Sequence, residues 1–68
     1  MQLRLKLARR IRSLRIERGY SVAVLAERAG VHRNYIMRLE SRTPPRVTVE
    51  TLAKIAAALG VKLVDLLS

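Results

Sequence analysis

The chain has 68 residues and a net charge of +9, from 14 Lys and Arg residues against 5 Asp and Glu residues. A chain this short buries only about 60% of the surface that its unfolded form exposes, so we expect one domain over residues 1–68 with a small stability margin. The absence of cysteine excludes disulfides, zinc fingers, iron–sulfur clusters and thiol catalysis. No segment approaches the roughly 18 apolar residues of a membrane span, and the N-terminal MQLRLKLARR lacks the apolar run of a secretion signal, so we expect a cytoplasmic protein.

The positive charge is concentrated in the first two-thirds of the chain. Residues 1–46 contain 12 of the 14 basic residues, 11 of them arginine, whereas residues 47–68 contain two lysines and two acidic residues. The planar guanidinium group suits phosphate oxygens and guanine edges. This asymmetry favours a surface that binds a polyanion over an ordinary solvated surface.

The first predicted helix covers residues 2–18. Leu7, Ile11 and Leu14 recur at helical spacing on one face, and Gly19 follows as the C-terminal glycine. The alternating leucines at its start would also suit a short strand, but they run without a break into the helical pattern. We therefore expect one long helix here.

Capping residues and glycines delimit the later helices. Ser21 and Thr48 are typical N-cap residues, and Gly30 and Gly60 end the apolar periodicity that precedes them. The run SRTPPR is a loop, because its two prolines remove backbone donors and disfavour helix in the residue before them. The expected helices are 22–29, 32–41, 49–59 and 63–67, which gives an all-α, compact five-helix domain.

The second and third helices carry a motif. Two short helices joined by a three- to four-residue turn must cross steeply, which requires a small residue at the crossing and a left-handed residue in the turn. Ala26 and Gly30 supply them. Val31, Ile36 and Leu39 supply the aliphatic side chains that hold the second of these helices from below.

Nearly the whole chain resembles the phage repressor/Cro-type (XRE-like) helix-turn-helix family, through the segments IRSLRIERGYS, LAERAGVHRNYIMRLE and TLAKIAAALGVKLVDLL. The resemblance implies a lambda-repressor-like fold in which the helix at 32–41 enters the major groove of double-stranded DNA. It also implies a structural pair between Arg15 and Glu40. The sequence departs from the family at Val22, where glutamine is usual, at His32, where serine or threonine often caps, and at Arg42, where glycine is common. These departures suggest that backbone contacts have shifted toward the loop that follows the recognition helix.

Helical spacing separates the residues that read bases from those that support the helix. With Ile36 and Leu39 inward, Arg33, Asn34, Met37 and Arg38 face outward. Arginine can bind guanine and asparagine can bind adenine in bidentate fashion, although either arginine could instead contact a phosphate. Met37 could contact a thymine methyl group or lie at the rim without a role. The residues expected to read bases are His32, Arg33, Asn34 and Arg38, although His32 could equally cap the helix or contact a phosphate.

Phosphate contacts are expected from the start of the second helix and from the loop. Free amides at a helix N-terminus attract anions. The candidates are Ser21, Tyr35, Arg42, Thr43 and Arg46, although Tyr35 could serve packing alone. The arginines of the first helix are expected to form a solvated face that attracts DNA over a distance.

The expected function is sequence-specific DNA binding by a transcriptional regulator, in particular a repressor, of bacterial or phage type and associated with the nucleoid. We expect no catalysis, because the single His32 and the single Asp65 lie on separate helices, and no cofactor, metal or small-molecule ligand. Two alternatives are a membrane-surface role for the basic first helix and a protein-interaction module, such as an antitoxin.

A homodimer on a palindromic operator is also expected, because one recognition helix reads too few base pairs to find a site in a genome. The C-terminal segment GVKLVDLLS is neutral and rich in aliphatic residues. The candidate interface residues are Val61, Leu63, Val64 and Leu67, although all of them could instead close the core.

Overall fold

The computed structural model describes residues 3–67, which form five α-helices and no strand. The helices are α1 (Leu3–Glu17), α2 (Val22–Ala29), α3 (Arg33–Leu39), α4 (Val49–Leu59) and α5 (Leu63–Leu67). The predicted all-α, five-helix class is confirmed.

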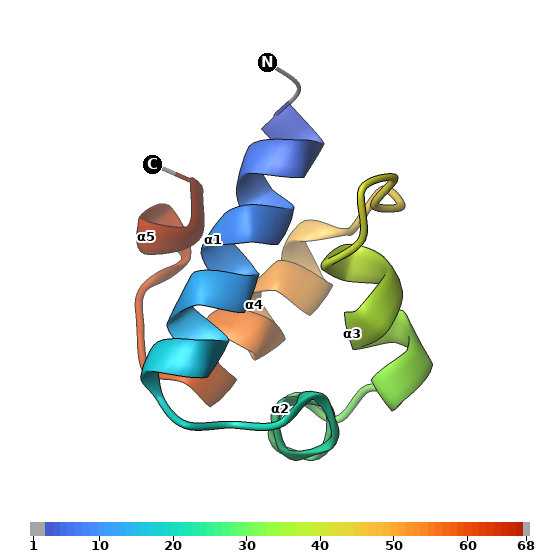
Figure 1. Cartoon of the computed structure of the whole chain (residues 1–68). Helices are drawn as coiled ribbons and strands as arrows, with labels where there is room; N and C mark the ends of the chain where they lie inside the picture. The colour runs from blue at the N-terminus through green and yellow to red at the C-terminus, as the bar shows by residue number, and fades with distance from the viewer. Residues whose placement is uncertain (1–2, 68) are drawn as a thin grey trace.

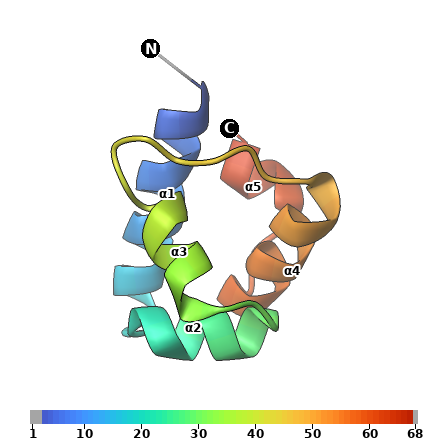
Figure 2. The same ribbon diagram turned by 90° about the vertical axis from the view of Figure 1, so that its right-hand side faces the viewer.

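The helices surround one core in a molecule of 28 × 23 × 22 Å. In Figure 1, α1 crosses the front of the molecule with α4 behind it, α3 lies to the right, α5 to the left and α2 below. Figure 2, turned by 90°, shows α3 facing the viewer and the segment from α3 to α4 running over the top. Helix α2 packs on both α3 and α4, and α5 packs on α1 and α4.

All five helices contribute side chains to the core. The most deeply buried of these are aliphatic, and they come from positions at helical spacing: Ile11, Leu25, Ile36, Leu39, Ile55, Leu59 and Leu66. The apolar face of α1, with Leu7, Ile11 and Leu14, is buried here. These three side chains are therefore covered by the protein's own core and are not available to a membrane surface.

The connections after α1, α2 and α4 share one geometry. Each contains a glycine in the left-handed region, at φ of 71° or 72°. The N–H of the apolar residue that follows donates to the carbonyl five residues earlier, as in Val31 to Ala26 and Val61 to Ala56, both at 3.0 Å. This is the Schellman motif, which satisfies helix carbonyls that would otherwise lack donors.

Two predicted boundaries differ from the structure. Helix α3 was expected over 32–41 and is shorter, because His32 is extended (φ −73°, ψ 141°) and Glu40 leaves the helical conformation (φ −88°, ψ 0°). Both residues flank the helix as caps rather than belonging to it. Helix α1 ends at Glu17 rather than at residue 18, and its expected start at residue 2 lies outside the described residues.

Candidate nucleic-acid interface

Helices α2 and α3 are joined by a tight turn over residues 30–32. Ala26 is buried in α2, whose packing against α3 is extensive. Gly30 has φ of +71°, a conformation that L side chains rarely adopt, and so a substitution here would be strained. The small residue and the left-handed turn expected from the sequence thus occupy the places that the motif requires.

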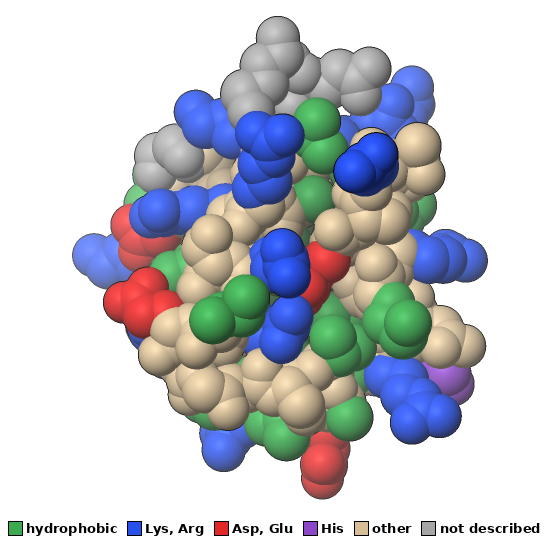
Figure 3. Space-filling view, viewed as in Figure 1, with side chains coloured by type: hydrophobic (Ala, Val, Ile, Leu, Met, Phe, Trp, Pro, Cys, Tyr) green, Lys and Arg blue, Asp and Glu red, His purple; other side chains and the backbone are tan. Residues whose placement is uncertain are grey.

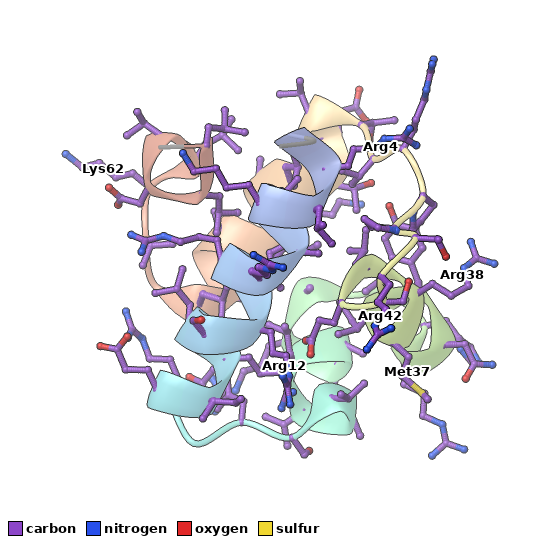
Figure 4. All side chains as sticks on the ribbon, turned by 45° about the horizontal axis from the view of Figure 1, so that its top comes forward. Arg4, Arg12, Met37, Arg38, Arg42 and Lys62 are labelled. Atoms are coloured by element: carbon purple, nitrogen blue, oxygen red, sulfur yellow. The ribbon has the colours of Figure 1, made fainter. Side chains whose placement is uncertain are left out.

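One face of α3 is buried and the other is open to solvent. Ile36 and Leu39 are 0% and 2% exposed, and they fix the helix on the core. The side chains of Arg33, Asn34, Met37 and Arg38 are exposed on the opposite side. Figure 4 shows Met37 and Arg38 pointing away from the ribbon, and in Figure 3 Lys and Arg side chains project along the right-hand edge, where α3 lies. Within the described residues, no side chain hydrogen-bonds or pairs with those of Arg33, Asn34 or Arg38, so their polar atoms are available to a ligand.

His32 caps α3 through its ring. Its Nδ1 accepts a hydrogen bond of 3.1 Å from the backbone N–H of Asn34, and its side chain remains exposed. Because Nδ1 is engaged in the cap, Nε2 is the ring atom left for an external partner. The sequence left three roles open for His32, namely capping, a phosphate contact and base reading. The structure shows the capping hydrogen bond.

Ser21 begins α2 in the same manner. Its Oγ accepts from the N–H of Val24 at 3.1 Å, which leaves the hydroxyl hydrogen free to donate outward. The amides of Val22 and Ala23 lie in the first turn, where a helix has N–H groups without intrahelical partners. Donors and the positive end of the helix dipole thus converge at this end of α2.

The loop after α3 presents three further candidates. Arg42, Thr43 and Arg46 are exposed, and Pro44 between them is buried. The turn is organised by Ser41, whose hydroxyl donates to the carbonyl of Arg38 at 2.7 Å and accepts from the N–H of Thr43 at 3.3 Å. Tyr35 is half-buried and packs against the core.

Arg15 and Glu40 form a two-pronged ion pair. Arg15 Nε donates to Glu40 Oε2 at 2.7 Å, and its Nη2 donates to Oε1 at 2.9 Å. The side chains are 13% and 8% exposed. Arg15 Nη1 also donates to the carbonyl of Tyr20 at 2.8 Å. The hydrogen bond to Glu40 raises the pKa of Arg15, so this guanidinium is held in its charged form.

Two arginines of the α1 segment have contacts that sequence reasoning missed. Arg18 Nε donates to the carbonyl of Leu59 at the end of α4, at 2.9 Å, and Arg10 Nε donates to the carbonyl of Asp65 in α5, at 3.0 Å. The sequence predicted that both arginines lie on a solvated face. Arginine commonly binds the free carbonyls at the C-terminal end of a helix, which could have indicated these contacts. The partners lie 41 and 55 residues away in the chain, however, so the sequence did not identify them.

The C-terminal candidates divide into two pairs. Val61 and Leu63 are partly buried against the core, whereas Val64 and Leu67 are 61% and 47% exposed. Beside Leu67 lies an open hollow of about 380 Å³, which no sequence pattern predicted. Its lining is mostly aliphatic with two arginines: Arg4, Leu7, Arg46, Val47, Leu52 and Leu67.

The described residues offer neither a membrane span nor a metal site. No described helix is long and apolar enough to cross a membrane. No group of three or more His, Asp or Glu side chains in residues 3–67 is placed to hold a metal ion.

Comparison with known proteins places this geometry in a family. The profile of the Cro/C1-type HTH DNA-binding domain matches residues 10–68. The HTH-type transcriptional regulator SinR of Bacillus licheniformis is 36% identical over 62 residues, which are 91% of this chain and 56% of that protein, so the chain spans little more than half of this relative's length.

Solved structures agree with this match. A hypothetical transcription factor, NHTF, from Neisseria is 36% identical with a TM-score of 0.91, covering 98% of this chain and 76% of that one. SinR in complex with DNA is 35% identical with a TM-score of 0.85, covering 91% and 98%. These relatives are described as transcription regulators, and the chain belongs to the Cro/C1-type helix-turn-helix DNA-binding domain family.

Proposed function

We propose that this chain regulates transcription by binding a specific double-stranded DNA sequence, with α3 in the major groove. The observation that carries the proposal is the outward face of α3, where Arg33, Asn34 and Arg38 are exposed on a helix fixed by Ile36 and Leu39. Arginine and asparagine are the side chains that bind guanine and adenine edges in bidentate fashion. The SinR relative has been crystallised with DNA, which supports DNA binding by this chain.

The base-reading set is His32, Arg33, Asn34 and Arg38. His32 differs from the others, because its Nδ1 is engaged in the cap of α3. We assign it a hydrogen bond from Nε2 to a phosphate or a base at the groove edge. The other three are free to adjust their side chains to base edges.

The phosphate-binding set is Ser21, Tyr35, Arg42, Thr43 and Arg46. In Figure 1, α2 lies below α3 and the loop after α3 lies above it, so Ser21 and the first amides of α2 offer donors on one side of α3 and the loop residues offer them on the other. Contacts to phosphates fix the register of a protein on DNA and carry no sequence information themselves. Two anchored flanks would hold α3 in the groove between them.

We assign the protein to repression as a homodimer. A bound domain of this size excludes other proteins from the same DNA, which suffices for repression when the operator overlaps a promoter. Pairing would occur through α5 and the residues before it, where Val64 and Leu67 are exposed and Val61 and Leu63 are partly buried against the core. The hollow beside Leu67 gives side chains of a second copy a place to pack.

Selection of bound sequences from a random duplex pool tests the proposal. We expect one enriched motif with two-fold symmetry. Affinity for this motif should fall steeply with salt, because neutralising roughly four to six phosphates per copy releases condensed counterions. Fluorescence anisotropy at several salt concentrations measures this slope. No enriched motif, or an affinity that does not change with salt, would contradict the proposal.

A further inference from the structure

The outward face of α3 contains one apolar side chain among polar ones. Met37 is 57% exposed and projects from the helix between positions occupied by arginine and asparagine (Figure 4). It does not belong to the core cluster or to the partly buried side chains packed against it. The support of α3 therefore does not depend on Met37, and the residue is free for an external contact.

We propose that Met37 reads the methyl group of a thymine in the major groove. The inference rests on the proposed function, because it requires α3 to lie in that groove. The edges of the bases present hydrogen-bond donors and acceptors there, and the thymine 5-methyl group is the apolar feature that distinguishes one base. A thioether side chain has several rotatable bonds and adapts to an apolar surface, so Met37 can reach this group without displacing α3.

The position of Met37 on α3 specifies where this thymine lies. Met37 follows Arg33 by four residues, so the two side chains share one side of the outward face. Four residues correspond to about 6 Å along a helix, and stacked bases are about 3.4 Å apart. The thymine is therefore expected within about two base pairs of the base that Arg33 binds.

Deoxyuridine provides the test, because it pairs as thymine does and lacks only the 5-methyl group. Each thymine of the selected site is replaced in turn, and the affinity of the 68-residue chain is measured by anisotropy. At one position per half-site, wild type should lose about fourfold in affinity, the worth of one buried methyl group. Met37→Ala should bind the thymine and uracil sites equally at that position, and Met37→Leu should keep the preference.

Val49→Ala is the matched control. Val49 is an exposed aliphatic residue, 68% accessible, at the start of α4 rather than on α3. This variant should retain the wild-type response to uracil. Since Met37 and Val49 are both exposed, neither variant should change the melting temperature by more than about 4 °C.

The outcomes separate this inference from the proposed function. If wild type binds the selected site but tolerates uracil at every position, or if the site has no thymine near the base lost in Arg33→Ala, Met37 does not read a methyl group although DNA binding stands. If Met37→Ala keeps the full thymine preference, another residue reads it. If no sequence is selected at all, the proposed function itself fails.

Discussion

The side chain of Arg15 joins three segments that must be aligned for DNA binding. From α1 it reaches the carboxylate of Glu40 at the end of α3 and the carbonyl of Tyr20 just before α2. Tyr20 is also held by Arg28, whose guanidinium carbon lies 4.7 Å from the centre of its ring. One guanidinium thus fixes both helices of the helix-turn-helix relative to α1.

Glu40→Gln should therefore destabilise the fold by about 3 kcal/mol. The substitution leaves a mostly buried guanidinium without its counter-charge, and the cost of an unpaired buried charge exceeds the worth of the bond itself. Thermal unfolding followed by circular dichroism measures the change. The control is Glu17→Gln. Glu17 Oε1 lies 3.7 Å from Arg18 Nη1, and the side chain of Glu17 is 68% exposed. Such surface pairs contribute less than about 1 kcal/mol. Equal melting temperatures for both variants would mean that the pair of Arg15 and Glu40 contributes no more to stability than the exposed pair does.

The sequence predicted the positions of some residues and missed the contacts of others. The inward position of Ile36 and Leu39 followed from helical spacing, because burial repeats with the period of the helix. The partnership of Arg15 with Glu40 came from the family resemblance, since spacing alone does not join residues 25 apart. The contact of Arg18 with Leu59 was not predicted, because it depends on where the end of α4 lies in space.

At the scale of the helices, caps determine both the boundaries and the proposed anchors. Ser21, His32 and Thr48 begin α2, α3 and α4, and each side chain accepts a hydrogen bond from an amide of the first turn. The sequence predicted two of these caps from residue type. Histidine is not a usual cap, so the predicted start of α3 was one residue early. The base-reading candidates on the helix, Arg33, Asn34 and Arg38, nevertheless face solvent as predicted.

Ser21→Ala and Thr48→Ala form a matched pair that separates stability from DNA binding. Both remove an N-cap hydrogen bond of 3.1 Å, and each should cost about 1 kcal/mol of stability. Ser21 belongs to the proposed phosphate-binding set and Thr48 does not, so only Ser21→Ala should also weaken binding, by a similar factor on specific and scrambled duplexes. Melting and anisotropy at a temperature where both variants are folded provide the two readouts. Equal affinities of the two variants would remove Ser21 from the phosphate-binding set.

Helix α3 and the loop after it should respond differently to the loss of arginine. Arg33→Ala and Arg38→Ala should each cost about 1–3 kcal/mol on the selected site and relax the preference at one base position. Arg42→Ala and Arg46→Ala should weaken binding to selected and scrambled duplexes by similar factors and reduce the salt slope. Anisotropy on both duplexes measures each effect. If the α3 and loop variants lose affinity alike on both duplexes, the division between reading and anchoring residues is wrong.

At the scale of the molecule, α3 and α5 lie on different sides of the fold. Figure 1 shows α3 to the right of α1 and α5 to its left, and Figure 2 shows α5 behind the face that α3 presents. A second copy at α5 would therefore leave α3 open to DNA. The sequence predicted apolar surface in this segment but not its division, because only the packing of α5 on α1 and α4 decides which aliphatic side chains remain outside.

Val64→Asp with Leu67→Asp should convert a dimer into a folded monomer. Half-sites one helical turn apart are about 34 Å from each other, and two copies paired through α5 would hold their α3 helices more than one molecular width, at least 22 Å, apart. Two aspartates on each copy would repel one another across a two-fold interface, yet both positions are exposed enough to accept charge within one copy. Sedimentation at micromolar concentration should show a dimer for wild type and for Val49→Asp, and a monomer for the double variant. The double variant should bind a single half-site with the affinity of wild type. Unlike wild type, it should not bind the complete two-half-site duplex more tightly than a single half-site. A wild type that stays monomeric both free and on DNA, with a selected site lacking symmetry, would refute pairing through α5.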